Sequence, residues 1–238
     1  MKCWASEFTT CAGPQSGEHY FSKSLFDGNC VTFKGLSWCR GRAVAIPLSK
    51  AKANILCKRH NELLSGADDE ASKFQSAIER LHPEPQLASN GGTQSPSKRI
   101  TLSGLLLSRW LTKTYCNVQA VEKRPIDERF VAHSFGGETQ TLRFYLHAGM
   151  GLKSQFKTGD VRCQGCWDDR GNTVWFVRLA GVDWIVSTVG LRELGDHVPL
   201  DNQWYPIQQF HERPHELKIT PMIDGNRPVT TGLLELLW

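Results

Sequence analysis

The first third of the chain alternates short apolar and polar runs and then changes to a helical period. The runs "CVTFKGLSWC" (30–39) and "GRAVAIPL" (41–48) are typical of a pair of short strands. Residues 67–81, "ADDEASKFQSAIERL", predict a helix in which Asp68 is the N-cap and acidic residues fill the first turn. An apolar stripe at helical spacing supports this helix: Phe74, Ala77, Ile78 and Leu81.

The second half of the chain begins with a helical pattern and continues mostly as strands. Residues 101–121, "TLSGLLLSRWLTKTYCNVQAV", predict a buried amphipathic helix. The runs 172–181 and 182–190, "NTVWFVRLAG" and "VDWIVSTVG", are rich in Val, Ile, Trp and Phe, and predict two strands joined by a short turn. Residues 161–179 predict a hairpin that turns at 169–172. The pattern indicates one helix packed on an antiparallel sheet.

A polar segment separates these two halves. Residues 83–99, "PEPQLASNGGTQSPSKR", are rich in Pro, Gly, Ser, Asn and Gln and have no apolar period, which is typical of a linker or an exposed loop. We therefore expect an N-terminal domain over 1–82 and a second domain over 100–238. The predicted fold class is α+β, with a small N-terminal domain followed by an α+β domain that has an antiparallel sheet.

Composition and charge narrow the class of protein. The 238 residues are 40% hydrophobic and 22% charged, which excludes a disordered chain. The net charge of +4 is compatible with a polyanionic partner. The N-terminus "MKCWASEFTT" lacks the apolar region of a secretory signal, and no window reaches the roughly 18 apolar residues of a membrane span. We expect a cytoplasmic protein that does not engage a membrane.

The cysteines point to a metal. Five of the eight fall within the first 57 residues, and clustered cysteines in a cytosolic chain favour metal binding over disulfides. Cys57 and His60 have the C-x2-H spacing of a metal half-site. Cys30 and Cys39 remain alternatives for the other half, and buried, metal-free cysteines remain a second explanation. The set we expect to bind structural Zn²⁺ is tetrahedral and closed to substrate: Cys3, Cys11, Cys57 and His60.

Two stretches carry a family resemblance. "GEHYFSKSLF" (17–26) is followed by the strand pair and then by "ANILCKRHNELLSG" (53–66). Two early cysteines, an acidic residue next to a histidine, a later asparagine and a second metal pair occur in the order that resembles the HNH endonuclease family. The resemblance covers roughly residues 1–66. It implies a zinc-stapled ββα-metal domain that hydrolyses phosphodiester bonds with a divalent cation, although the second pair here is C-x2-H where the family commonly has C-x2-C.

The resemblance also implies roles for individual residues. His19 corresponds to the general base, and an imidazole with an ordinary pKa of about 6.5 suits that task. Glu18 and Asn61 would hold a catalytic Mg²⁺ or Mn²⁺ through hard oxygen atoms. Asn54 corresponds to the central asparagine that fixes the loop. Proteins of this kind often belong to bacterial defence systems or mobile elements.

The expected partner is nucleic acid, with DNA favoured over RNA. Basic residues of the N-terminal domain would contact backbone phosphates without reading sequence: Lys23, Arg40, Arg42, Lys58 and Arg59. The sequence indicates no specific function for the domain over 100–238. We expect it to be an accessory domain that binds a protein partner or forms a homo-oligomer. Its Cys163-x2-Cys166 pair has no evident second half-site.

Two other classes of function stay open. The zinc unit is also compatible with a non-catalytic module that binds nucleic acid or protein. A structural or assembly protein that acts through its C-terminal sheet is the third class. Glu18, His19 and Asn61 discriminate between them, because a binding module needs no base beside a hard-metal ligand.

Overall fold

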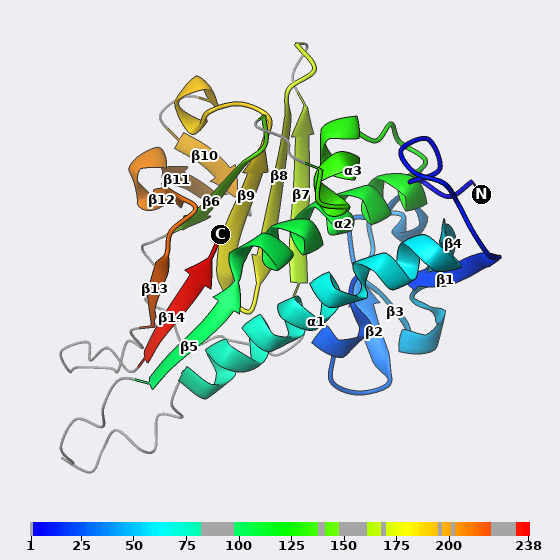
Figure 1. Ribbon diagram of the computed structural model, residues 1–238, viewed down its shortest axis with the longest axis horizontal. Helices are drawn as coiled ribbons and strands as arrows, with labels where there is room; N and C mark the ends of the chain where they lie inside the picture. Colours follow the sequence, from blue (N-terminus) through cyan, green and yellow to red (C-terminus); the bar gives the residue numbers. More distant parts are fainter. Residues whose placement is uncertain are drawn as a thin grey trace. The chain divides into compact units, whose positions relative to one another are not determined.

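The computed structural model describes residues 2–81, 98–137, 141–147, 161–167, 170–194, 197–200, 203–219 and 232–238. The chain forms two compact units (Figure 1). Unit 1 comprises residues 1–72 and 106–139, and unit 2 comprises residues 73–105 and 140–238. In the described part of the chain, no helix combines the length and the apolar character that crossing a membrane requires.

Unit 1 is built on a strand pair that leads directly into a helix. Strand β1 (Gln15–His19) pairs antiparallel with β4 (Lys52–Cys57), and Glu18 lies opposite Ala53. Helix α1 (Lys58–Leu81) begins at the residue after β4, as Figure 1 shows in blue and cyan. The order strand, strand, helix is therefore present, with a long insertion between the two strands.

The insertion contains the predicted strand pair and three short 3-10 helices. β2 (Cys30–Phe33) and β3 (Val44–Pro47) form an antiparallel hairpin, which confirms the pattern of residues 30–48. Phe33 on β2 contacts three other aromatic rings of the insertion, and these contacts form an aromatic cluster: Tyr20, Phe21 and Trp38. The 3-10 helices are η1 (Lys23–Leu25), η2 (Ser37–Cys39) and η3 (Leu48–Lys50).

The helix predicted over 67–81 exists but begins earlier, at Lys58. Asp68 is therefore not an N-cap: it lies in the middle of α1, and its side chain contacts Ser22 and Lys113. The physical reason is that the buried stripe continues upstream through Leu64 and Ala67, so the whole segment after β4 has an apolar face to bury.

The compact units do not follow the expected division at residues 83–99. Helix α2 (Gly104–Glu122) confirms the helix predicted over 101–121, yet residues from 106 onward belong to unit 1. On the buried face of α2, Trp110 donates a hydrogen bond to Ser22, and Asn117 donates one to the carbonyl of His19. Helix α3 (Glu128–Ser134), capped by Asp127, completes this unit.

Unit 2 contains a five-stranded antiparallel sheet in the order β12-β6-β9-β8-β7. The hairpins predicted from 161–190 are both present: β7 pairs with β8, and β8 pairs with β9. Ala180 and Gly181 connect β8 to β9 with positive φ angles of 52° and 75°, the backbone of a type I′ turn. The strands are β6 (Arg143–His147), β7 (Val161–Trp167), β8 (Thr173–Leu179), β9 (Val182–Ser187) and β12 (Phe210–Glu212).

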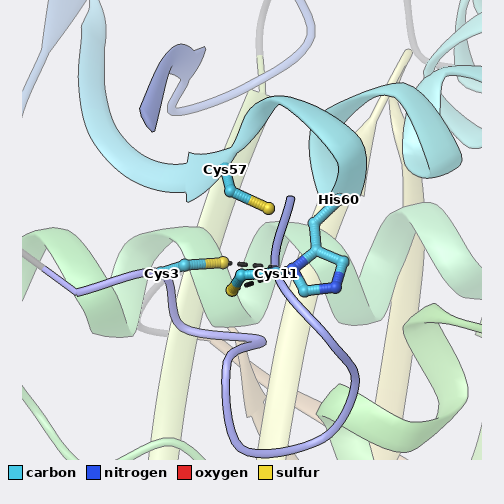
Figure 2. Close-up of side chains that lie close together, drawn as sticks. All are labelled: Cys3, Cys11, Cys57 and His60. Atoms are coloured by element: carbon cyan, nitrogen blue, oxygen red, sulfur yellow. Dashed lines mark hydrogen bonds between the residues drawn. The ribbon is translucent and has the colours of Figure 1, made fainter. Parts of the chain in front are cut away.

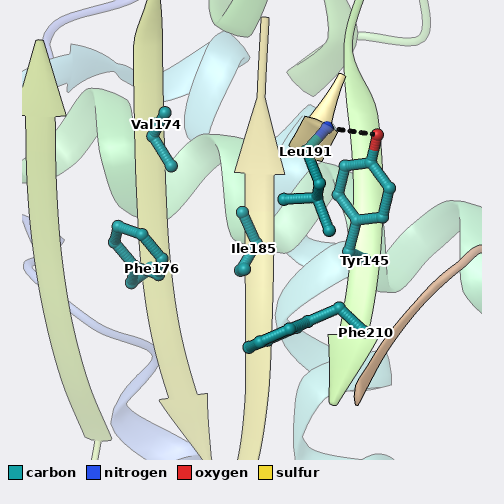
Figure 3. Packing of buried hydrophobic residues seen from close by; sticks show 6 residues of the cluster. All are labelled: Tyr145, Val174, Phe176, Ile185, Leu191 and Phe210. Atoms are coloured by element: carbon teal, nitrogen blue, oxygen red, sulfur yellow. Dashed lines mark hydrogen bonds between the residues drawn. The ribbon is translucent and has the colours of Figure 1, made fainter. Parts of the chain in front are cut away.

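Both faces of the central strands β8 and β9 are buried. On one face an apolar cluster forms (Figure 3), in which the hydroxyl of Tyr145 accepts the N–H of Leu191 at 3.4 Å. Trp184 precedes Ile185 on β9, so its side chain lies on the other face of the sheet. Its ring is 5.5 Å from the ring of Phe74, which lies in the last turns of α1. The cluster in Figure 3 consists of Tyr145, Val174, Phe176, Ile185, Leu191 and Phe210.

A second sheet of unit 2 contains a parallel pair that the sequence patterns did not predict. β14 (Gly232–Leu237) pairs antiparallel with β13 (Glu216–Ile219) and parallel with β5 (Lys98–Ser103). The end of the expected linker is thus part of a strand, and residues 83–97 of that linker lie outside the described residues. A separate hairpin joins β10 (His197–Leu200) and β11 (Gln203–Pro206).

Candidate metal centre and pocket

Four metal-ligating side chains converge in unit 1. The ligand atoms of Cys3, Cys11, Cys57 and His60 all lie within 4.8 Å of one another. Figure 2 shows the three sulfur atoms and the imidazole turned toward a common point. The Sγ atoms of Cys3 and Cys11 lie 3.2 Å and 3.9 Å from Nδ1 of His60. The structure thus brings together the four residues that the sequence grouped.

Backbone hydrogen bonds hold the N-terminal loop against the junction of β4 and α1. The N–H of Trp4 donates to the carbonyl of Ile55 at 2.9 Å, which fixes the loop beside β4. The N–H of Lys58 donates to Pro14 at 2.9 Å, so a loop carbonyl satisfies the first turn of the helix. Cys57 ends β4 and His60 lies in that first turn, so the local fold places both on the loop side.

The electrostatics differ between the cysteines of the cluster. Burial, followed by the neighbouring Cys3 and Cys57, raises the pKa of Cys11 to about 11. Burial acts to raise the pKa of Cys57, but the N–H groups of His60 and Ala12 and the neighbouring thiols outweigh it and lower the pKa. The start of a helix also favours a thiolate. Burial and the nearby Arg59 lower the pKa of His60, which favours the neutral ring that a metal requires.

The donor set fits zinc. Thiolate and imidazole ligands of tetrahedral zinc lie about 3.5–3.8 Å apart, so the ligand atoms of this set need only small shifts to surround an ion. Thr9 adds an outer contact, because its hydroxyl lies 3.0 Å from Nε2 of His60 and leaves Nδ1 facing the sulfur atoms. The two alternative cysteines lie elsewhere: Cys30 is exposed on β2 and Cys39 is buried in η2.

A pocket of about 550 Å³ lies on the same unit. It gathers residues from β1, from the insertion and from α1, and four of the residues predicted for the active site line it: Glu18, His19, Lys23 and Asn61. Ser22, Leu48 and Asp68 line it as well. Asn54 is exposed on β4 and lies outside the lining that the described residues provide, as do the exposed Arg40, Arg42, Lys58 and Arg59.

His19 is oriented by a backbone carbonyl. The ring bonds to the carbonyl of Leu48, and Nε2 is shielded from water without a hydrogen-bond partner. Burial is the main cause that lowers the pKa of His19, and the charges of Lys52 and Lys23 lower it further. The ring is thus held as a neutral acceptor.

Glu18 is buried and already has a cationic partner. Its Oε1 lies 2.7 Å from Nζ of Lys113 and accepts a hydrogen bond from Asn117 at 3.3 Å. Burial raises the pKa of Glu18, while Lys113 opposes that rise. Burial would lower the pKa of Lys113, but the carboxylates of Asp68 and Glu18 outweigh it and raise the pKa, so the ammonium stays charged.

Three side chains with carboxylate or amide oxygen atoms line this pocket. Asn61 donates from Nδ2 to Ser16 at 3.0 Å, which leaves its amide oxygen as the end that can ligate an ion. Glu18 and Asp68 contribute carboxylates to the same lining. Two carboxylates and an amide oxygen suit Mg²⁺ or Mn²⁺ in kind, and Lys113 neutralises part of their charge.

Sequence reasoning missed three residues of this region. Lys113 lies on a helix assigned to the other domain, and a lysine in an amphipathic helix is usually exposed. Asp68 was assigned to a helix start. Thr9 belongs to no sequence motif that would have indicated a contact with the metal cluster. The one available signal was the Lys113 position itself, which falls among apolar residues at the centre of the buried stripe of 101–121.

Other cysteines give no second cluster among the described residues. Cys163 lies on β7, and burial raises its pKa to about 12. The side chain of Cys166 lies outside the described part of the structure.

Comparisons with known proteins do not identify a family for this chain. No family model, no curated protein and no solved structure matches the chain.

Proposed function

We propose that the protein is an HNH-type endonuclease that hydrolyses phosphodiester bonds, with His19 as the general base. The observation that carries the proposal is the placement of His19 in the pocket. His19 lies next to Glu18 on a strand pair that leads into a helix, and both residues line the pocket. Asn61, on the first turns of that helix, lines the same pocket.

The chemistry follows from this arrangement. The neutral ring of His19 would accept the proton of a water molecule in the pocket as that water attacks phosphorus, and the backbone hydrogen bond to Leu48 would stabilise the imidazolium that forms. A divalent cation held by Glu18 and Asn61 would supply positive charge to the phosphoryl and leaving oxygens. Lys23 also lines the pocket and offers an exposed ammonium to a neighbouring phosphate.

The metal cluster supports the proposal as a structural zinc staple. Four protein ligands close the coordination shell, so that ion would have no open position for substrate. His60 is a ligand and the next residue, Asn61, lines the pocket, while Cys57 ends the strand that pairs with β1. The staple would therefore fix the distance between the base and the cation ligand.

The charge of the insertion supports a nucleic-acid partner, with DNA favoured over RNA. The segment 20–57 has a single acidic residue, Asp27. Its basic residues are all exposed, which suits contact with backbone phosphates: Lys23, Lys34, Arg40, Arg42, Lys50 and Lys52.

A nicking assay tests the proposal. The purified, zinc-loaded chain is incubated with supercoiled plasmid, single-stranded DNA and RNA, each with Mg²⁺, with Mn²⁺ and with EDTA. We expect cleavage of at least the plasmid that requires the added cation. Zinc content is measured after the EDTA arm, so that loss of the staple is not mistaken for loss of the catalytic cation. Absence of cation-dependent cleavage on all three substrates contradicts the proposal.

A second candidate function rests on a specific contact. Lys113 pairs with Glu18 at 2.7 Å, as in a site that has no need of a catalytic cation. The corresponding function is a non-catalytic zinc module that binds nucleic acid. Binding of the same three nucleic acids without cleavage, unaltered in His19→Ala, is the result that favours it.

A further inference from the structure

Two carboxylates that line the pocket share one buried ammonium. Nζ of Lys113 lies 2.7 Å from Oε1 of Glu18 and 2.6 Å from Oδ2 of Asp68. The Lys113 side chain is 2% exposed, whereas that of Asp68 is 23% exposed. Both carboxylates line the pocket, whereas Lys113, which pairs with both of them, is not part of the lining.

The ammonium is held rigidly. Trp110, Lys113 and Asn117 lie on one face of α2 at helical spacing. Trp110 donates to Ser22 at 2.7 Å, and Ser22 donates to Asp68 at 2.5 Å. Asn117 donates to Glu18 at 3.3 Å. Each carboxylate therefore has a second donor besides Lys113, and the network orients both of them toward the same ammonium.

We infer that Lys113 is a positioning residue that competes with the divalent cation for Glu18 and Asp68, and so sets the cation concentration at which the pocket loads. The inference rests on the proposed function for its cation. A divalent ion on Glu18 would share a carboxylate with an ammonium at hydrogen-bond distance, and the two positive charges repel. Asp68 is the more open of the two carboxylates, so it is the side from which an ion enters.

Direct Mn²⁺ binding tests this inference without any cleavage measurement. Free Mn²⁺ is followed by electron paramagnetic resonance in titrations of the zinc-loaded full chain. Lys113→Met removes the charge at similar length, and Lys113→Arg keeps it as the matched control. We expect Lys113→Met to bind Mn²⁺ at least about tenfold more tightly than wild type, as loss of a unit charge beside the ligands requires. Lys113→Arg should bind like wild type.

Two further arms keep the test decisive. Adding Glu18→Gln to Lys113→Met should abolish the gain, which locates the ion at Glu18; a gain that persists contradicts the inference. If Lys113→Met loses its zinc or its cooperative melting, the test compares wild type with Glu18→Gln instead. Weak oxygen-ligated sites have dissociation constants of about 10⁻⁴ M or higher. A wild-type Mn²⁺ site that binds more tightly than this and is lost in Glu18→Gln contradicts the inference. A weaker Glu18-dependent site supports it.

The failure of this inference is distinguishable from failure of the proposed function. Equal Mn²⁺ affinities in wild type and folded Lys113→Met overturn the role of Lys113 and leave cleavage by the His19 pocket untouched. A tighter Mn²⁺ site in Lys113→Met, without cleavage of any substrate, supports the role of Lys113 and overturns the nuclease.

Discussion

At the scale of single residues, Thr9 fixes the ring that completes the metal cluster. Its hydroxyl lies 3.0 Å from Nε2 of His60. We predict that Thr9→Val lowers zinc affinity by about 10–100-fold, the usual effect of losing an outer contact to a ligating histidine. The neighbouring, exposed Thr10 provides the control, because Thr10→Val should leave affinity unchanged. Competition with a chromogenic chelator measures both, and equal affinities of the two variants contradict the assignment.

Zinc loading tests the ligand set at the same scale. Cys57→Ser removes a sulfur ligand at the start of α1, and we expect it to purify without stoichiometric zinc and to melt at a lower temperature, because metal binding and folding are coupled. Cys30→Ser removes an exposed thiol outside the cluster and should keep one zinc per chain. Metal analysis by mass spectrometry separates the cases. Full zinc content in Cys57→Ser would show that Cys57 is not a ligand.

The pKa of His19, the proposed base, gives a further test at the scale of single residues. Burial first, and then Lys52 and Lys23, lower the pKa of His19, because a nearby positive charge disfavours the imidazolium. Removing one of these charges in Lys52→Met should therefore raise the pKa of His19. Lys50→Met is the control, since Lys50 is exposed on η3. An NMR titration of the His19 ring measures the shift, and an unchanged midpoint in Lys52→Met contradicts the electrostatic account.

At the scale of elements, α1 supports the sheet of unit 2 through its last turns. Phe74 is fully buried and its ring lies 5.5 Å from Trp184. We predict that Phe74→Ala lowers the free energy of unfolding by about 3–5 kcal/mol, the cost of a cavity in a packed core. Leu63 on the same helix is 60% exposed, so Leu63→Ala should change it by less than about 0.5 kcal/mol. Denaturant unfolding compares the two, and similar losses contradict the burial of Phe74.

The elements also show what sequence patterns can and cannot predict. Periodicity identified α2 and the hairpins of β7, β8 and β9, because their burial follows the local period of side chains. Motif spacing grouped Cys57 with His60, since both lie within one strand-to-helix junction. The parallel pairing of β5 with β14 and the return of α2 to unit 1 depend on contacts far apart in sequence, for which no local pattern exists.

At the scale of the whole molecule, exposed charge favours binding to a polyanion. We predict that nucleic-acid affinity falls steeply as the salt concentration rises. Replacing Lys34, Arg40 and Arg42 by Ala should reduce the slope of the logarithm of the binding constant against the logarithm of the salt concentration by up to about 3, because each contact with a duplex phosphate contributes about 0.9 to that slope. The control variant removes three exposed charges from unit 2, at Arg143, Arg170 and Arg192, and should leave the slope unchanged. Fluorescence anisotropy across a salt series measures both. Equal slopes in the two variants contradict binding through the insertion.

The most direct test of the nuclease is the single-turnover nicking rate of His19→Ala, measured on a preparation with full zinc content. His19 contacts the attacking water in the proposed mechanism, so we predict a loss of at least about 100-fold, the usual contribution of a general base. His211→Ala, which removes an exposed histidine on β12, should nick at the wild-type rate. A folded, zinc-loaded His19→Ala that nicks at an unchanged rate would contradict the central claim.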